Sequence, residues 1–262
     1  MQIFVINLPS ATERSRLQKD QLNKLGLEYK ILDATSVEDI SEATYKKHYF
    51  DWQRPLRKTE VACYFSHRFA WDRVIRSGEP ALILEDDAIL SIFLPELLDN
   101  LNKIKSTDLI NLENRSRKKF VSRSHMEIEC NSTLLRLYQD RTGAAGYILW
   151  PSGANKLIQH EKNSGIGLAD AHITSCHALK AYQVEPSPII QLDQCKEYGI
   201  SNTYSHTVSK STVSASDNYR GGVYFMIKKL FSQLKLAFWQ LYIITKSHRR
   251  YIKLRNSDFN DS

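Results

Sequence analysis

The chain has 262 residues, enough to bury a core as one large domain or two small ones. Hydrophobic residues make up 42% and charged residues 25% of it, the ordinary composition of a soluble globular protein. No apolar run approaches the roughly 18 residues of a membrane span, and the chain opens without the basic segment of a signal peptide. The four cysteines are far apart and form no CxxC pair, which indicates neither a zinc site nor a disulfide framework. We therefore expect a cytoplasmic protein with reduced thiols.

The net charge of +7 is unevenly distributed. Residues 218–257 contain nine basic side chains and no acidic one, whereas the preceding residues are balanced in charge. These basic residues are Arg220, Lys228, Lys229, Lys235, Lys246, Arg249, Arg250, Lys253 and Arg255. The asymmetry predicts a surface-binding segment appended to the main domain.

The start of the chain has the pattern of a strand, a helix and a second strand. Residues 3–8 are apolar, a helix with regularly spaced leucines runs on to Gly26, and residues 29–34 form the next strand, which includes Asp33. The sequence has no GxGxxG motif and no P-loop motif, which argues against a dinucleotide cofactor and a P-loop nucleotidase. Arg14, near the start of the helix, either meets a phosphate group or is a solvated helix residue.

A second helix is predicted between Thr59 and Gly78. Thr59 is the expected N-cap, apolar residues recur at helical spacing, and Gly78 ends the helix. Ser66 and His67 interrupt the apolar stripe. His67 is either a satisfied core residue or a participant in chemistry, and the sequence leaves both interpretations open.

The most distinctive stretch is residues 81–88, where an apolar run leads directly into Glu85, Asp86 and Asp87. The pattern is typical of a buried strand that delivers charge to the carboxyl edge of an α/β sheet, where ligands bind. Crowded carboxylates repel one another unless a cation lies between them, and Mg²⁺ and Mn²⁺ prefer oxygen ligands. The alternative is a solvated acidic turn in front of a helix at residues 94–104.

Two later strands also end in polar residues. Residues 108–113 form one of them, which ends at Glu113 and leads into a basic stretch, residues 115–123. That stretch either meets an anionic acceptor or is a solvated loop. The other is a strand broken by prolines within residues 184–192. The polar residues expected to close the fold near the site are Gln191, Asp193 and Gln194.

Three motifs, taken in order, resemble glycosyltransferase family 25. They are Asn7-Leu8 followed by Arg14, residues 60–63 followed by Ser66-His67, and residues 82–87. The resemblance covers roughly residues 1–205, and it departs from the family at Thr59, where the family usually has glycine. That family contains bacterial lipopolysaccharide and lipooligosaccharide galactosyl- and glucosyltransferases. It implies an α/β fold of the GT-A type, with a Rossmann-like mixed sheet flanked by helices.

The resemblance also implies a UDP-sugar donor and a divalent metal, Mn²⁺ or Mg²⁺, at the acidic motif. By this resemblance Glu85 and Asp87 are metal ligands, with Asp87 in direct contact, and Asp86 meets the ribose or sugar of the donor. Residues 143–147 resemble a family segment that shapes the floor for donor sugar and acceptor. The donor-binding residues expected in this way are Asn7, Leu8, Arg14, Asp33, Ser66, His67, Asp86, Gly143 and Gly146. A cation held by the acids would stabilise the charge that develops on the departing diphosphate.

Asp170 is the expected catalytic base. It lies in a glycine-flanked turn that opens a helix, and related inverting enzymes place an acid there to deprotonate the acceptor hydroxyl. The competing interpretation is that Asp170 only caps the helix, and Glu113 is a rival base. His172 and His206 are possible third metal ligands, although either can equally be structural.

The chain is expected to divide into a GT-A-like domain at residues 1–205, a linker at 206–218 and a basic amphipathic tail at 219–262. Aromatic and aliphatic residues alternate with lysines over 219–256, which favours binding to an anionic membrane surface. The alternatives are a helix that packs back on the domain and a dimer contact. Nucleic acid suits the charge, but no nucleic-acid-binding motif is present, so no such partner is expected.

The function expected from these observations is transfer of a hexose, galactose more than glucose, from a UDP-sugar to a lipid-linked lipooligosaccharide or lipopolysaccharide acceptor. Inversion to a β-linkage is expected, with the enzyme peripheral on the cytoplasmic face of the bacterial inner membrane. Two other classes stay open. One is a metal-dependent phosphoester hydrolase that uses the same acids, and the other is a non-catalytic membrane-docking protein of a glycan assembly complex.

Overall fold

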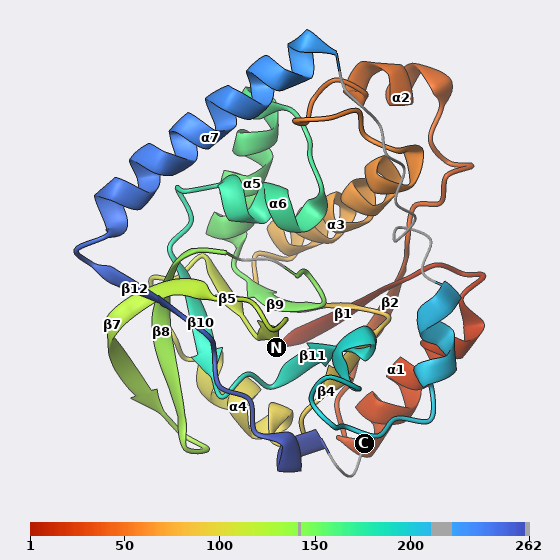
Figure 1. Cartoon of the computed structure of the whole chain (residues 1–262). Coiled ribbons are helices and arrows are strands. Elements are labelled where there is room, and N and C mark those ends of the chain that lie inside the picture. Colours follow the sequence, from red (N-terminus) through yellow and green to blue (C-terminus); the bar gives the residue numbers. More distant parts are fainter. Residues whose placement is uncertain (141–142, 211–221, 260–262) are drawn as a thin grey trace.

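A nine-stranded mixed sheet forms the centre of the computed structural model, which describes residues 1–140, 143–210 and 222–259 (Figure 1). In spatial order the strands are β12 (Ser247–Arg250), β7 (Lys119–Ile128), β8 (Ser132–Gln139), β10 (Ala181–Glu185), β5 (Leu109–Asn111), β9 (Gly146–Leu149), β3 (Ala81–Glu85), β1 (Gln2–Asn7) and β2 (Lys30–Asp33). Strands β1, β2 and β3 are parallel, and β9 is antiparallel to both β3 and β5. The carboxyl ends of β1, β2, β3 and β5 therefore lie at one edge of the sheet, where the acidic motif was predicted.

A second, three-stranded sheet extends this edge. It consists of β4 (Ala88–Leu90), β11 (Ile189–Gln191) and β6 (Glu113–Asn114). Strand β4 follows β3 after the two-residue turn Asp86–Asp87, and β6 follows β5 after Leu112. Two strands of the large sheet thus pass directly into the small one, which brings residues far apart in sequence to the acidic turn.

Helices cover both faces of the large sheet (Figure 1). They are α1 (Thr12–Lys24), α2 (Glu42–His48), α3 (Lys58–Ser77), α4 (Leu94–Leu101), α5 (Pro151–Ser164), α6 (Ala169–Ser175) and α7 (Val223–Ile243), with 3-10 turns η1 (Leu192–Gln194), η2 (Ser205–Lys210) and η3 (Asn256–Phe259). Alternate residues of β3 pack into the cores on the two faces of the sheet, because successive side chains along a strand point to opposite sides. Ile83 packs in the core with α3 and α5, whereas Leu82 and Leu84 pack in the core with α4. In the described residues we find no helix with both the length and the apolar character needed to cross a bilayer.

The predicted helix between Thr59 and Gly78 is present, but its N-terminal cap was predicted wrongly. Gly78 ends α3 in the left-handed conformation, with φ at 70°, as expected for a C-terminal glycine. The N-cap is Arg57 rather than Thr59. The buried Glu60 carboxylate accepts a hydrogen bond from the Arg57 backbone N–H at 2.9 Å, so an acid in the first turn does the capping.

The region after β6 contains more strand than the sequence pattern indicated. The basic stretch 115–123 was expected to be a loop, yet β7 begins at Lys119 and forms a long hairpin with β8. The side chain of Lys119 is fully buried, and its Nζ donates to the Glu113 carbonyl oxygen at 2.8 Å and to Gln183 Oε1 at 2.7 Å. A lysine inside a sheet does not follow from local sequence, because its burial depends on partners from other strands.

The C-terminal segment packs against the body of the protein. Helix α7 runs along the outside of the molecule (Figure 1), and the ring of Trp239 stacks on His177 at 4.1 Å. At the other end of the helix the ring of Phe225 stacks on Phe50 at 5.7 Å. Strand β12 then pairs with β7, so this part of the predicted tail belongs to the main sheet. The domain boundaries stay a prediction, and residues 211–218 of the expected linker lie outside the described residues.

Replacement of Glu60 by Gln is expected to lower the free energy of unfolding by about 1–2 kcal/mol at pH 7. Burial alone would raise the pKa of Glu60, but hydrogen bonds from Arg54 and Arg57 hold it below its ordinary value of 4.5. A carboxyl whose pKa is lowered by folding stabilises the protein above its unfolded pKa, and this stabilisation is lost as the pH falls through the folded value. The difference between wild type and variant should therefore narrow below about pH 4.5.

Urea denaturation between pH 3 and 8 measures this difference. The matched control is Glu42→Gln, because Glu42 is exposed and forms a surface ion pair with Lys58 at 3.0 Å. A difference that does not change with pH would contradict the assigned role of Glu60.

Candidate active site

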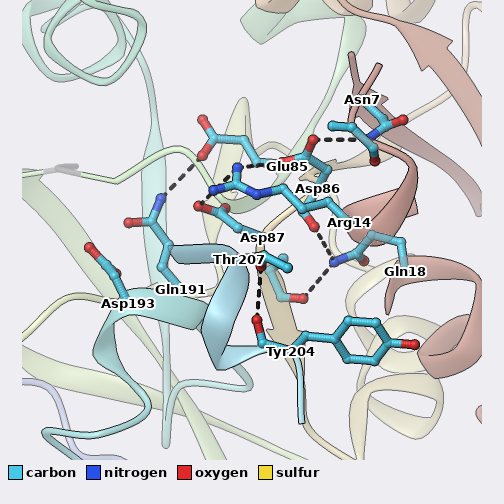
Figure 2. A network of polar contacts seen from close by, with 12 residues as sticks. Asn7, Arg14, Gln18, Glu85, Asp86, Asp87, Gln191, Asp193, Tyr204 and Thr207 are labelled. Atoms are coloured by element: carbon cyan, nitrogen blue, oxygen red, sulfur yellow. Dashed lines mark hydrogen bonds and ion pairs between the residues drawn. The ribbon is translucent and has the colours of Figure 1, made fainter. Parts of the chain in front are cut away.

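Backbone and side-chain contacts hold the acidic turn Asp86–Asp87 in place (Figure 2). Gln18 of α1 donates from Nε2 to the carbonyl oxygens of Asp86, at 3.2 Å, and Ala88, at 2.7 Å. Gln21, one turn further on, donates to the same Ala88 oxygen at 3.0 Å and accepts from the Leu90 N–H at 2.9 Å. The turn is therefore positioned by buried amides of a helix rather than by its own loop geometry.

Asp86 is held by two of the residues predicted to bind the donor. Asn7 Nδ2 donates to Asp86 Oδ2 at 2.8 Å, and Arg14 Nη1 donates to Oδ1 at 3.1 Å (Figure 2). Burial raises the pKa of Asp86 above its ordinary value, although Arg14 and Asn7 both act to lower it. The structure thus brings Asn7, Arg14 and Asp86 together, and Arg14 lies in the first turn of α1.

Glu85 is held by groups from two distant elements. His67 Nε2 lies 3.0 Å from Glu85 Oε1, and Gln191 Nε2 donates to Oε2 at 3.1 Å. The other ring nitrogen of His67, Nδ1, lies 3.0 Å from the Tyr147 hydroxyl, which also accepts from Trp71 Nε1 at 2.8 Å. Burial raises the pKa of Glu85, but His67, Arg115 and Gln191 together outweigh burial and keep the pKa below its usual value. Glu85 is thereby maintained as a carboxylate.

Asp87 and Glu113 are the two acids of the site that each have a buried oxygen without a partner. Asp87 Oδ1 and Glu113 Oε1 are buried without a hydrogen-bond partner. Burial, together with the neighbouring Glu85 and Asp86, raises the pKa of Asp87 to about 8. Burial and Glu85 raise the pKa of Glu113 to about 8 as well.

These properties fit a divalent cation. Buried carboxylate oxygens without partners are rare in proteins, and mutual repulsion between acids is what a bound cation removes. Carboxylate oxygens such as those of Asp87 and Glu85 are the ligands that Mg²⁺ or Mn²⁺ prefers.

The glycine segment lies against the acids. Gly143 has φ at 87°, and a Cβ at this position would lie 2.3 Å from Glu113 Oε1, so only glycine fits. The Gly143 N–H points to Asp170 Oδ2 at 3.4 Å. Gly146 begins β9, where a Cβ would lie 2.4 Å from Ile189 Cδ1. At both glycines the space that a Cβ would take is filled by side chains of the protein itself.

Asp170 lies in the first turn of α6 and does not cap it. The N-cap is Leu168, and no side chain caps this helix end. The interpretation of Asp170 as only a capping residue is therefore wrong. Gly143 thus lies close to the carboxylates of both Asp170 and Glu113.

The remaining residues predicted to lie at the site make contacts elsewhere in the fold. Ser66 Oγ accepts from the Thr35 N–H at 2.9 Å and so ties the end of β2, where Asp33 lies, to α3. His172 is buried and stacks on Trp71, and burial lowers its pKa to about 4. His206 is exposed, 3.3 Å from Glu13 Oε1. Leu8 lies directly after β1, and its carbonyl oxygen accepts a hydrogen bond from the Ala11 N–H.

The sequence analysis did not identify four residues as part of the site, namely Arg115, Gln18, Gln21 and Cys63. Arg115 donates to Gln191 Oε1 and forms an ion pair with Asp193 Oδ2 at 2.9 Å, so Gln191 and Asp193 close the fold at the site as predicted. Gln18 and Gln21 were read only as helix residues, and Cys63 only as an isolated thiol. Gln18, Gln21 and Cys63 are distinguished by the burial of a polar side chain on a helix, and this burial can be recognised only once the packing is known.

The comparisons with known proteins give one family. Residues 1–174 match the model of "Glycosyltransferase family 25 (LPS biosynthesis protein)". No curated protein matches the chain. Among solved structures, the A197 protein from STIV has 15% identity and a TM-score of 0.38, covering 70% of this chain and 80% of its own. The inositol-1-phosphate CTP transferase from T. maritima has 11% identity and a TM-score of 0.42, covering 82% and 98%.

Replacement of Asp87 by Asn is expected to raise the melting temperature of the metal-free protein by about 3–6 °C. A carboxyl whose pKa is raised by folding, here from 3.8 to about 8, destabilises the protein as the pH rises through this interval. The gain should therefore be larger at pH 8 than at pH 5. Thermal denaturation with chelator present measures it.

Added Mn²⁺ should stabilise the wild type and leave Asp87→Asn unchanged, because a ligand of the native state raises stability only where it binds. Asp99→Asn, an exposed position on α4, is the control. An unchanged or lower melting temperature for Asp87→Asn without metal would contradict the picture of repelling acids.

Proposed function

The chain belongs to glycosyltransferase family 25, and on this basis we propose that it transfers a hexose from a UDP-sugar to a lipooligosaccharide or lipopolysaccharide acceptor. Membership of the family makes it a glycosyltransferase of lipopolysaccharide biosynthesis with a GT-A-like fold, as the motifs predicted. Galactose is the preferred donor sugar in our proposal, and glucose the second choice.

The observation that supports this proposal is the unsatisfied oxygen of Asp87 beside Glu85, at the carboxyl edge of the parallel strands. We propose that these two residues hold Mn²⁺ or Mg²⁺, which would stabilise the negative charge on the leaving diphosphate. Arg14 Nη1 lies 4.0 Å from Asp87 Oδ2 and 3.1 Å from Asp86 Oδ1. A guanidinium in this position is suited to bind the phosphate oxygens of the donor.

Asp170 is the proposed base. In this role its carboxylate accepts the proton of the acceptor hydroxyl while that oxygen attacks the anomeric carbon from the face opposite the diphosphate, which inverts the configuration. The rival, Glu113, is completely buried, and its pKa of about 8 keeps it protonated at neutral pH. We therefore assign to Glu113 the support of Gly143 and, through Gly143, of Asp170.

The proposed membrane partner binds to the outer face of α7. On this face exposed apolar side chains recur every three or four residues, with exposures from 46% to 71%. They are Val223, Ile227, Leu230, Leu234, Phe238 and Leu241. The inward face carries Phe225, Trp239 and Ile243, which pack on the body, so the outer stripe is not needed for the fold.

Charge favours an anionic bilayer over a second copy of the chain. Lys229 and Lys235 of the same helix are exposed, whereas Lys228 donates to the carbonyl oxygens of Phe50 and Asp51, and no acid occurs between residues 218 and 257. Two such faces would repel one another, whereas anionic lipid attracts both the lysines and the apolar stripe. We propose that the enzyme is peripheral on the cytoplasmic face of the bacterial inner membrane, where its lipid-linked acceptor would be within reach.

Calorimetric titration of UDP tests the donor site. The wild type should bind UDP in the presence of Mn²⁺ and lose at least about tenfold in affinity without it, and Asp87→Ala should lose the metal-dependent part. Asp170→Asn is the matched variant, and it should keep UDP binding while losing sugar transfer. Absence of UDP binding with and without Mn²⁺ would overturn the assignment.

The same enzyme preparation distinguishes a transferase from a phosphoester hydrolase. Mass spectrometry after incubation with UDP-galactose should show a hexose added to a lipooligosaccharide acceptor. Free sugar released at the same rate without acceptor would instead favour the hydrolase.

Phe238→Glu should weaken sedimentation with vesicles of phosphatidylglycerol and phosphatidylethanolamine by about tenfold, because a charge on the outer stripe opposes insertion. Binding by the wild type should fall with added salt. Met126→Glu places the same charge on an exposed apolar site of β7 and is the control. Equal vesicle binding by wild type and Phe238→Glu, or self-association of the wild type without vesicle binding, would contradict the proposal.

A further inference from the structure

We propose that Cys63, His67 and Glu85 form a second cation site, which shares Glu85 with the site proposed for Mn²⁺ or Mg²⁺ and takes borderline-soft divalent ions such as Zn²⁺. Cys63 and His67 are one helical turn apart on α3 and so share one face of the helix, and Glu85 is the last residue of β3. One ligand atom from each lies within 4.8 Å of the other two. Among the described residues, this is the group of His, Cys, Asp and Glu side chains whose ligand atoms converge.

The distances are close to those of a bound ion. Ligands at zinc distances of about 2.0–2.3 Å in a tetrahedral arrangement are about 3–4 Å from one another. His67 Nε2 and Glu85 Oε1 are already 3.0 Å apart, so only the Cys63 Sγ atom has to approach. Cys63 is half-buried, and its Sγ atom lies within 4.8 Å of both of the other ligand atoms.

The charge around Cys63 favours a cation over a free thiolate. Burial raises the pKa of the Cys63 thiol, and the negative charges of Glu85, Asp170 and Asp87 raise it further. The thiol is therefore protonated and a poor nucleophile at neutral pH. A divalent cation that replaces the thiol proton relieves the same repulsion, so metal binding should release a proton to the solvent.

Further contacts orient both of the other ligands. Gln191 holds the second oxygen of Glu85 at 3.1 Å. Zinc on His67 Nε2 leaves the imidazole proton on Nδ1, which the Tyr147 oxygen, 3.0 Å away, accepts. A hydrogen bond on the second ring nitrogen is the usual support of a metal-binding histidine.

The ligand set separates this site from the one proposed for Mn²⁺ or Mg²⁺. Sulfur and imidazole ligands select zinc, while hard ions prefer a site made of oxygen atoms alone. Glu85 belongs to both sites, so zinc bound to Cys63 withdraws Glu85 from Asp87. Zinc is therefore expected to inhibit the enzyme. Because zinc sites are tetrahedral, three protein ligands leave one position on the ion for water.

Titration of the metal-stripped full chain with Co²⁺ and Zn²⁺, without any nucleotide, tests the site. Wild type should show thiolate-to-cobalt charge-transfer absorption that equimolar Zn²⁺ abolishes, with release of a proton. Cys63→Ser should lose the absorption and at least about tenfold in zinc affinity. Cys130→Ser, at a half-buried cysteine on the β7–β8 turn, is the matched control and should behave as wild type.

Asp87→Ala should keep the cobalt absorption, because Asp87 is not a ligand of this site. A cobalt complex without the thiolate band, or equal zinc affinity of wild type and Cys63→Ser, would overturn the proposal. Both results are independent of UDP binding, so failure of the zinc site and failure of the proposed transferase function are distinguishable.

Discussion

Repulsion between carboxylates at the end of β3 is the constraint on which the arrangement of the site depends. Three consecutive acids lie at the end of this strand, and each has a different environment. Asp86 is hydrogen-bonded by Asn7 and Arg14, and Glu85 by His67 and Gln191. Asp87 has a buried oxygen without a hydrogen-bond partner. A network in which two acids are satisfied and the third is not keeps the site poised for a cation.

The parts of the fold that could be predicted depend on local sequence. The apolar run before Glu85 predicted β3, and the positive φ of Gly78 explains why a glycine marked the end of α3. The family resemblance implied that Asn7, Arg14 and the acids serve one site, and the rule that carboxyl ends of parallel strands share an edge explains why Asn7 lies beside the acids. The spacing of three motifs identified the family, and the family supplied the fold.

The rest depended on partners that sequence alone does not identify. Gln191 lies 106 positions from Glu85 in the chain, and no local pattern connects a glutamine at the end of a strand with an acid before a distant turn. Lys119 was assigned to a basic loop because its charge is visible in sequence, whereas its burial depends on Gln183 and Glu113. The cap of α3 was placed wrongly because a threonine is the commoner cap, and the acid one position later took that role.

The position of β12 changes how the C-terminal segment can be separated from the enzyme. Helix α7 is not a terminal appendage, because the chain returns after it to pair Ser247–Arg250 with β7, and the Asp258 carbonyl oxygen then accepts a hydrogen bond from the Ile92 N–H. A truncation placed before α7 removes the edge strand and exposes the backbone of β7, a template for aggregation. The apolar outer face of α7 is better changed by exchanging its exposed residues for polar ones, with both ends of the helix left joined to the fold.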